Sequence, residues 1–295
     1  MITFKAESIL LILFRNLFNC NNILKFISKR AILIVFLLLI TFSGYGQSIS
    51  VGSWNLKDFG NSKNDQEMEF IANTIRDFDV IIQEVVAGNG GAQAVARLHD
   101  ILNRKGLNWD YSISDPTFGS AYTTERYAYI WKTSRLEKIG DTWLDQKFNQ
   151  EINREPFFIR LSIDGNIFTL VNFYAITKSE QPETEIKYFK FFPEFYPNDN
   201  LIFCGDFNLP QSHTVFNPLK KLGYMPSLDG VKTSLRQKCI NGDCMASEFD
   251  NFFYDQAKIN LVSTGIIPFY RIFSDLREAR LISDHVPIYF EFVIK

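Results

Sequence analysis

Two short acidic motifs carry the side chains best suited to chemistry on a phosphate. One, Gly-Asp-Phe-Asn, follows an apolar run and supplies Asp206 and Asn208; the other, Ser-Asp-His, supplies Asp284 and His285 near the C-terminus. Carboxylate, amide and imidazole groups at the ends of buried strands are costly to desolvate without a partner. A divalent metal and a phosphate would be that partner. We therefore expect a hydrolase of phosphodiester bonds.

Other polar side chains fall next to, or within, segments that have the pattern of buried strands. Asn55, Glu84 and Tyr174 each follow an apolar run, and Asp250 lies among aromatic residues. Carboxylate and amide oxygens gathered over one edge of a sheet suit a hard cation. We expect magnesium or manganese there rather than zinc, with calcium as a further candidate ion.

The elements that must position these residues alternate between strands and helices. Expected strands cover residues 49–55, 79–83, 127–131, 157–163, 167–174, 201–204, 249–254 and 288–293. Expected helices cover 64–75, which opens with a capping box, 93–105, 182–192 and 214–222. Because residues 157–174 form an antiparallel hairpin, an all-parallel barrel does not fit. The expected fold is α/β (α+β), with two packed mixed β-sheets flanked by helices.

The composition indicates one catalytic domain with an aromatic, β-rich core. The chain has 295 residues, 46% of them hydrophobic and 15% aromatic, so it can bury a large core. Phe contributes 29 residues, many in alternating runs typical of sheet. The sequence contains no internal repeat and no low-complexity segment.

Residues 1–47 have the layout of a secretory signal peptide with its n-region. Basic residues precede the apolar run 31–40, and Gly44 and Gly46 are the small residues before a cut at Gln47. An uncleaved anchor is the alternative, but the run is shorter than the roughly 20 residues needed to span a bilayer. We expect residues 48–295 to be the catalytic domain, secreted or periplasmic, without stable membrane association after cleavage.

The mature chain is expected to carry a net negative charge, so its overall charge does not attract polyanions. The whole chain has 31 basic and 33 acidic residues, and residues 48–295 keep 26 basic and 32 acidic ones. Affinity for nucleic acid must therefore come from a local basic or hydrogen-bonding strip and from metal ions.

The cysteine spacing predicts a disulfide. Cys239 and Cys244 flank the pair Asn241-Gly242, which favours a tight turn, and an oxidising compartment would allow them to join. Two free thiols are the alternative. A zinc site is not expected, because no second Cys or His pair lies nearby at ligand spacing.

Seven segments resemble, in order, the endonuclease/exonuclease/phosphatase superfamily, and most closely its deoxyribonuclease I-like members. An isolated match to any one of them arises by chance, but seven in order do not. The segments are Ser53-Trp54-Asn55, Gln83-Glu84, Glu125-Arg126-Tyr127, Arg154-Glu155-Pro156, Gly205-Asp206-Phe207-Asn208, Phe249-Asp250-Asn251 and Ser283-Asp284-His285-Val286-Pro287. The resemblance implies a four-layer sandwich.

The resemblance also implies roles for the site residues. Glu84, Asn55 and Asp284 would hold the metal, while Asp206 and Asn208 would orient the attacking water and the phosphoryl oxygens. His285, paired with Asp250, resembles an acid/base histidine whose tautomer a carboxylate fixes. A structural histidine tied to a buried Asp is the alternative.

Tyr174 departs from the deoxyribonuclease I pattern, which has a second catalytic histidine at this place. Glu125, whose counterpart braces that histidine, is present. A tyrosine here resembles the exonuclease III branch of the superfamily, where it contacts the scissile phosphate. A phenol with a pKa near 10 is a poor base at neutral pH, but it can donate a hydrogen bond. We therefore expect slower cleavage than by a two-histidine enzyme, with Asp206 or His285 activating water.

Three further residues are candidate substrate contacts. Arg154 could bind a phosphate or the minor groove, with an ordinary surface arginine as the alternative, and Arg126 could contact the substrate from the loop before the next strand. Tyr127 could contact substrate or belong to the core.

The sequence favours a secreted, magnesium-dependent endonuclease that hydrolyses DNA with weak sequence preference, and RNA is a further candidate substrate. We expect a monomer. The alternative is a phosphodiesterase or phosphatase of the same fold that acts on lipid or inositol phosphates. A catalytically dead binding module is a third class, but it requires the loss of a metal ligand or of His285, and the chain retains them all.

Overall fold

The computed structural model describes residues 47–295 apart from residues 87, 89 and 120–124. The predicted signal peptide therefore lies, except for Gln47, outside the described residues. In the part that is described, no helix is long and apolar enough to cross a membrane.

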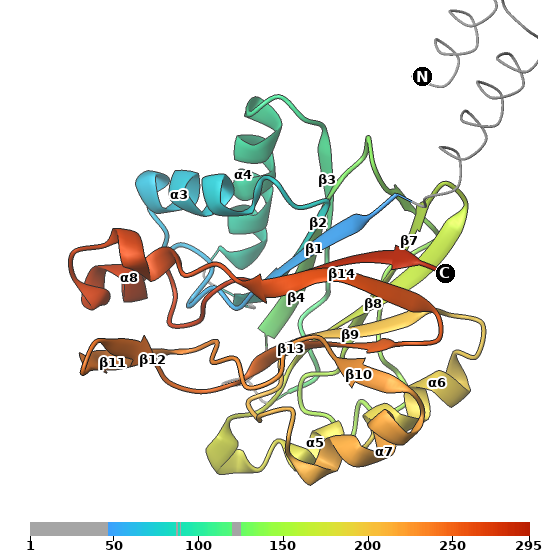
Figure 1. The fold of residues 1–295 in the computed structure, drawn as a ribbon. Coiled ribbons are helices and arrows are strands. Elements are labelled where there is room, and N and C mark those ends of the chain that lie inside the picture. The colour runs from blue at the N-terminus through green and yellow to red at the C-terminus, as the bar shows by residue number, and fades with distance from the viewer. Residues whose placement is uncertain (1–46, 87, 89, 120–124) are drawn as a thin grey trace, which may run out of the picture. The chain divides into compact units, whose positions relative to one another are not determined.

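Two mixed β-sheets form the centre of the described domain (Figure 1). The first has the order β14 (Ile259–Ile266), β15 (Ile288–Ile294), β1 (Ile49–Trp54), β2 (Val80–Val86), β4 (Glu125–Lys132) and β3 (Trp109–Ile113). The second has the order β10 (Tyr224–Pro226), β13 (Asp250–Asp255), β9 (Leu201–Asp206), β8 (Asn166–Tyr174), β7 (Phe157–Ile163) and β5 (Glu137–Lys138), and β6 (Trp143–Leu144) also pairs with β7. Strand β1 is parallel to β2, and β8 is parallel to β9, whereas β7 and β8 form the predicted antiparallel hairpin.

Helices cover the outer faces of the two sheets, as predicted. Helix α3 (Asp65–Ile75), α4 (Gly91–Arg104) and α8 (Leu276–Ile282) lie on the side of the first sheet, and α5 (Glu183–Ile186), α6 (Phe192–Phe195) and α7 (Asn217–Lys221) on the side of the second (Figure 1). Helix α3 begins at the predicted capping box, in which Asn64 and Glu67 bond each other's backbone N–H groups, and it buries Met68, Ile71, Ala72 and Ile75.

The helix predicted over residues 182–192 is wrong in extent. The chain forms the short helix α5, a 3₁₀ turn at Phe189–Phe191 and then α6, whose first turn contains Pro193. Proline has no backbone N–H, so it fits the first turn of a new helix but not the interior of a longer one. Pro218 marks a similar break between the 3₁₀ turn Thr214–Phe216 and α7.

A fully buried tyrosine of the first sheet ties it to the second. The Tyr129 hydroxyl lies 2.6 Å from the carbonyl oxygen of Phe157 and 3.0 Å from that of Leu170, and it accepts the N–H of Asn172 at 2.9 Å. The two sheets also meet through an apolar core that includes Val51, Phe168, Phe252 and Phe290. A single hydroxyl thus fixes how the sheets lie against each other near their centre.

Tyr129→Phe should lower the free energy of unfolding by about 1–3 kcal/mol, because buried polar groups on β7 and β8 lose their partner. Chemical denaturation of the purified domain measures this. Tyr111→Phe, at a half-buried tyrosine of β3, is the matched control and should change stability little. Equal effects of the two substitutions would contradict the assigned role of Tyr129.

Candidate active site

Strand pairing brings the predicted residues to one edge of the two sheets. Because β8 and β9 run parallel and β9 pairs with β13, Tyr174 and Asp250 both lie opposite Asp206 in the register of the second sheet. Asn55 directly follows β1 of the first sheet, and its side-chain Nδ2 donates to Asp206 Oδ2 at 3.0 Å. That hydrogen bond joins the two sheets at the site.

The site is a pocket of about 250 Å³. Eight of the predicted residues line it, and the full lining is Asn55, Leu56, Lys57, Asp58, Phe59, Glu84, Val85, Glu125, Tyr174, Thr177, Asp206, Asn208, Asp284 and His285. Glu84 and His285, which lie 201 positions apart in the numbering, therefore face the same space. Asp250 is buried and reaches the site through His285.

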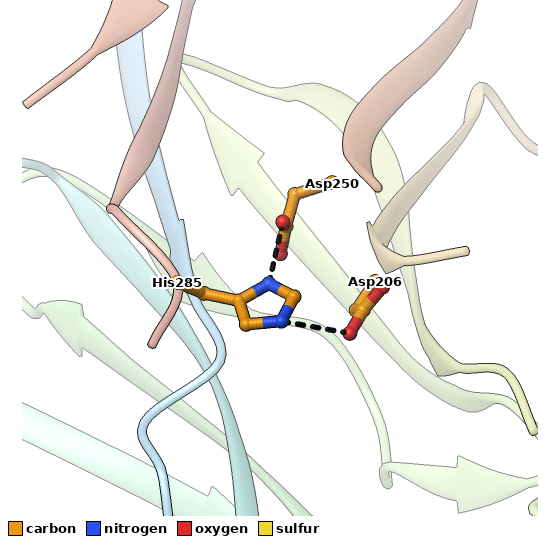
Figure 2. Close-up of side chains that lie close together, drawn as sticks. All are labelled: Asp206, Asp250 and His285. Atoms are coloured by element: carbon orange, nitrogen blue, oxygen red, sulfur yellow. Dashed lines mark hydrogen bonds and ion pairs between the residues drawn. The ribbon is translucent and has the colours of Figure 1, made fainter. Parts of the chain in front are cut away.

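His285 lies between two buried aspartates (Figure 2). Its Nδ1 is 2.7 Å from Asp250 Oδ2, and its Nε2 is 3.7 Å from Asp206 Oδ2. Burial by itself lowers the pKa of His285, but the charges of Asp250 and Asp206 outweigh it and raise the pKa to about 10. Thr233 Oγ1 donates to the same Asp250 oxygen at 2.6 Å, so the position of that carboxylate is fixed as well.

Asp206 is held by the loop that follows it. The N–H of Asn208, a residue with a φ of 52°, donates to Asp206 Oδ1 at 2.9 Å. Burial raises the pKa of Asp206 to about 6, although the charge of His285 acts in the opposite direction. At neutral pH Asp206 is therefore mostly a carboxylate facing an imidazolium.

Glu84 is the side chain in the pocket that most needs a cation. It is 3% exposed, and neither of its carboxylate oxygens has a hydrogen-bond partner among the described residues. Burial, followed by the charges of Asp250 and Asp206, raises its pKa well above the ordinary value. A bound divalent metal would supply both the missing ligand contacts and the missing positive charge. The residues at this place thus fit the predicted metal.

Two sets of side chains at the site could contact a metal. Ligand atoms of Asp206, Asp250 and His285 all lie within 4.8 Å of one another. In that set His285 Nδ1 already forms a short hydrogen bond with Asp250. We therefore assign His285 and Asp250 to proton transfer rather than to metal binding. The second set is the predicted one, Glu84 with Asn55 and Asp284. The two carboxylate oxygens of Glu84 have no hydrogen-bond partner among the described residues, so Glu84 is the better metal ligand. Asp284, a predicted ligand, lines the pocket and accepts a hydrogen bond from Arg280 at 3.1 Å.

Arg154 contacts Tyr174 rather than solvent. It is 6% exposed, and its guanidinium group lies 3.7 Å from the centre of the Tyr174 ring. Arg154 and Asn208 both donate hydrogen bonds to the carbonyl oxygen of Ala175, so the arginine braces both pocket-lining side chains. Burial and the charge of Asp206 raise the pKa of Tyr174 to about 12, which keeps the phenol protonated.

The other predicted substrate contacts lie away from the pocket. Tyr127 has no exposed surface, and its hydroxyl donates to Arg154 O at 3.0 Å and accepts the N–H of Tyr174 at 3.2 Å. It belongs to the core, so its assignment as a substrate contact is corrected. Arg126 donates to Ser114 O at 2.6 Å and does not line the pocket. Glu125 does line it, and burial raises its pKa to about 7.

The sequence analysis missed three polar pocket residues, Lys57, Asp58 and Thr177. Lys57 is exposed and, with His285, is one of two side chains in the lining that can carry a positive charge. The available signal was its place two residues after Asn55, in a loop that starts at a site residue.

A disulfide joins Cys239 and Cys244, the two cysteines for which the sequence predicts one. It closes the hairpin formed by β11 (Leu235–Ile240) and β12 (Asp243–Met245), which belongs to neither large sheet. Cys204 is a buried free thiol of β9.

Two curated proteins match the chain along most of its length, whereas no family model matches it. A deoxyribonuclease of Thioalkalivibrio sp. (strain K90mix) is 25% identical over a 287-residue alignment that covers 88% of this chain and 75% of that protein. Deoxyribonuclease-1-like 1 of Sus scrofa is 26% identical over a 271-residue alignment that covers 85% of this chain and 83% of that protein.

Solved structures share the fold. An endonuclease/exonuclease/phosphatase family protein from Bacteroides thetaiotaomicron has a TM-score of 0.63 at 14% identity, with 85% of this chain and 99% of that chain covered. A mannosyl-6-phosphatase from the same species has a TM-score of 0.58 at 16% identity, with 83% and 99% covered. The chain therefore shares the fold of solved structures of the endonuclease/exonuclease/phosphatase superfamily. Within it, the resemblance to deoxyribonuclease I-like members is confirmed by the names of the curated relatives.

In metal-free protein, His285 should keep its proton through neutral pH and release it near pH 10, because the charges of Asp250 and Asp206 stabilise the imidazolium. Asp250→Asn should lower this pKa, since the substitution removes one of the two charges. Imidazole signals followed by NMR against pH measure the effect, and His99 and His213 are internal controls that the substitution should not change. An unchanged His285 titration would show that the pair is not electrostatically coupled.

Proposed function

We propose that the protein is a secreted, divalent-metal-dependent endonuclease that hydrolyses phosphodiester bonds of DNA, and also of RNA, with weak sequence preference. The observation that carries the proposal is the unpartnered Glu84 carboxylate, which faces the same pocket as Asp206 and the His285–Asp250 pair. The names of both curated relatives support DNA as the substrate. The disulfide supports an oxidising compartment outside the cytosol.

Glu84, with Asn55 and Asp284 beside it, would hold magnesium or manganese. When bound, such an ion polarises a phosphoryl oxygen and neutralises charge that develops on it. Oxygen ligands suit a hard cation of this kind. Asn55 Nδ2 also donates to Asp206, so the same amide links the metal side of the pocket to the carboxylate on the other sheet.

The two titrating groups that face each other take opposite roles. Asp206, with a pKa of about 6, is a carboxylate at neutral pH and can accept the proton of an attacking water. His285, with a pKa of about 10, is an imidazolium whose Nε2–H can donate to a phosphoryl oxygen or to the leaving group. Because their surroundings separate the two pKa values in this way, Asp206 is assigned as the base and His285 as the acid. Asn208 and Tyr174 donate the remaining hydrogen bonds to the phosphate.

The proposal is tested with residues 48–295 incubated with supercoiled plasmid, RNA and phospholipid vesicles, each with magnesium and with chelator. We expect plasmid nicking that needs the metal and that is lost in His285→Ala. Vesicle cleavage without nicking would instead favour the lipid phosphodiesterase alternative, and the absence of any hydrolysis would favour a binding module. Secretion is tested separately, by N-terminal sequencing of the protein recovered outside the cytosol.

Glu84→Gln should abolish the rise in melting temperature that magnesium causes in the wild type, because ligand binding to the folded state is what stabilises it. With chelator present, the variant should be at least as stable as the wild type, since it no longer buries an unpaired carboxylate. Glu137→Gln, at an exposed position of β5, is the control. Thermal unfolding with and without magnesium measures both effects, and an unaltered magnesium shift in Glu84→Gln would remove this residue from the metal site.

Tyr174→Phe should lower kcat about 100-fold, the usual effect of deleting one donor to a developing oxyanion. Phe can keep the stacking with Arg154, so the fold and the substrate KM should change little. Plasmid nicking at saturating substrate measures the effect. Full activity of the variant would show that the phenol makes no contact in the transition state.

A further inference from the structure

The disulfide-closed hairpin β11–β12 is built as a separate, rigid arm. Its two strands pair with each other and with neither large sheet, and Figure 1 shows them projecting from the domain beside α8. Asn241 and Gly242 both have positive φ, at 50° and 82°, as a tight hairpin turn requires. A two-stranded hairpin is only marginally stable alone. The disulfide between Cys239 and Cys244 constrains the end of this hairpin, and Leu235 and Met245 at its base are buried in the core.

The base of this arm is continuous with the wall of the active site. Leu235 N–H donates to the carbonyl oxygen of Asp284 at 2.7 Å, and Ser234 forms a β-bridge with His285. Arg280 donates to Leu235 O at 2.8 Å and to the Asp284 carboxylate at 3.1 Å. The direction of the arm is therefore fixed relative to the reacting groups.

The arm is positively charged in a domain that is negatively charged. Residues 232–245 contain Lys232, Arg236 and Lys238 against the single acid Asp243, whereas residues 48–295 contain 26 basic and 32 acidic side chains. Lys232 lies 2.8 Å and Arg236 lies 3.6 Å from the same Asp243 oxygen, so these two cations occupy one side of the arm. Lys238 is exposed to solvent.

The length of the arm suits an extended polyanion. Six residues of β11 span at most about 20 Å, and successive phosphates along one strand of duplex DNA rise by about 3.4 Å. The arm can therefore reach phosphates beyond the one that occupies the pocket. A substrate with a single phosphate would not extend to it.

We propose that the hairpin β11–β12 is a contact arm for the nucleic-acid backbone on one side of the scissile phosphodiester. The inference rests on the proposed nuclease function. It adds the surface on which the nucleic acid would lie beside the pocket of this acidic protein. Lys232, Arg236 and Lys238 bind phosphates through charge, without reading the sequence of the bases.

The test compares a long and a short substrate. In the triple variant Lys232→Ala, Arg236→Ala, Lys238→Ala, kcat/KM for supercoiled plasmid should fall at least tenfold, and the slope of log kcat/KM against log salt should become shallower by about two to three. With bis(p-nitrophenyl) phosphate, which cannot span pocket and arm, kcat/KM should stay unchanged, and this also shows that the variant is folded. The matched control Lys138→Ala, Lys187→Ala, Lys221→Ala removes the same charge from exposed positions elsewhere and should alter neither substrate.

An equal loss on both substrates would overturn the proposal, because the arm would then act through the wall of the pocket. Unchanged plasmid cleavage would overturn it as well. Replacing the disulfide through Cys239→Ser and Cys244→Ser leaves the three cations in place. This variant should show a smaller fall in kcat/KM than the triple variant, and for plasmid only, because the arm is then less ordered.

A binding measurement separates this proposal from the proposed function. Fluorescence anisotropy of a labelled 30-base-pair duplex is recorded with His285→Ala in magnesium, with and without the three arm substitutions. Weaker binding of the arm variant supports the arm even if the wild-type protein cleaves no DNA. Equal binding, or no binding by either protein, overturns it.

Discussion

Burial of three carboxylates around one pocket is the constraint on which the site depends. Glu84, Asp206 and Asp250 are each at most 3% exposed, and their like charges repel at short range. One imidazolium, His285, compensates part of this charge through its two ring nitrogens. The negative charge that His285 does not compensate lies on Glu84, whose carboxylate oxygens have no hydrogen-bond partner among the described residues. The same electrostatic imbalance therefore accounts for the acid/base pair and for the need for a metal.

This imbalance can persist only because the surrounding structure is rigid. The site lies across the junction of two sheets, and strands carry several of its side chains: Glu84 lies in β2, Tyr174 and Asp206 end β8 and β9, and Asp250 begins β13. Hydrogen bonds between the sheets, from Asn55 to Asp206 and through the hydroxyl groups of Tyr127 and Tyr129, hold the two halves in register. The arginine that stacks on Tyr174 extends this support to the phenol. A residue predicted as a substrate contact, Arg154, thus acts on its neighbours.

Charge also separates the pocket from the surface beside it. The lining is rich in carboxylates and the domain as a whole is acidic, which opposes the approach of a polyanion. Lys57 at the pocket and the cations of the arm β11–β12 have the opposite sign. The proposed binding of the nucleic-acid backbone and the proposed cleavage reaction therefore lie on adjacent parts of the protein that have opposite charge.

The sequence by itself determined eight of the strands, the capping box at Asn64 and the residue types of the site, because these depend on local periodicity and on chemistry that single residues carry. It also predicted the two cysteines that pair. It did not predict β3 or β14, which complete the first sheet. It could not place Arg154 or Tyr127, since burial depends on which strands pair, and it predicted one continuous helix over residues 182–192 where the chain forms α5, a 3₁₀ turn and the start of α6. Only the tertiary structure decided that Glu84 lacks a partner and that a cationic arm begins at Asp284, because both depend on distances between segments far apart in the chain.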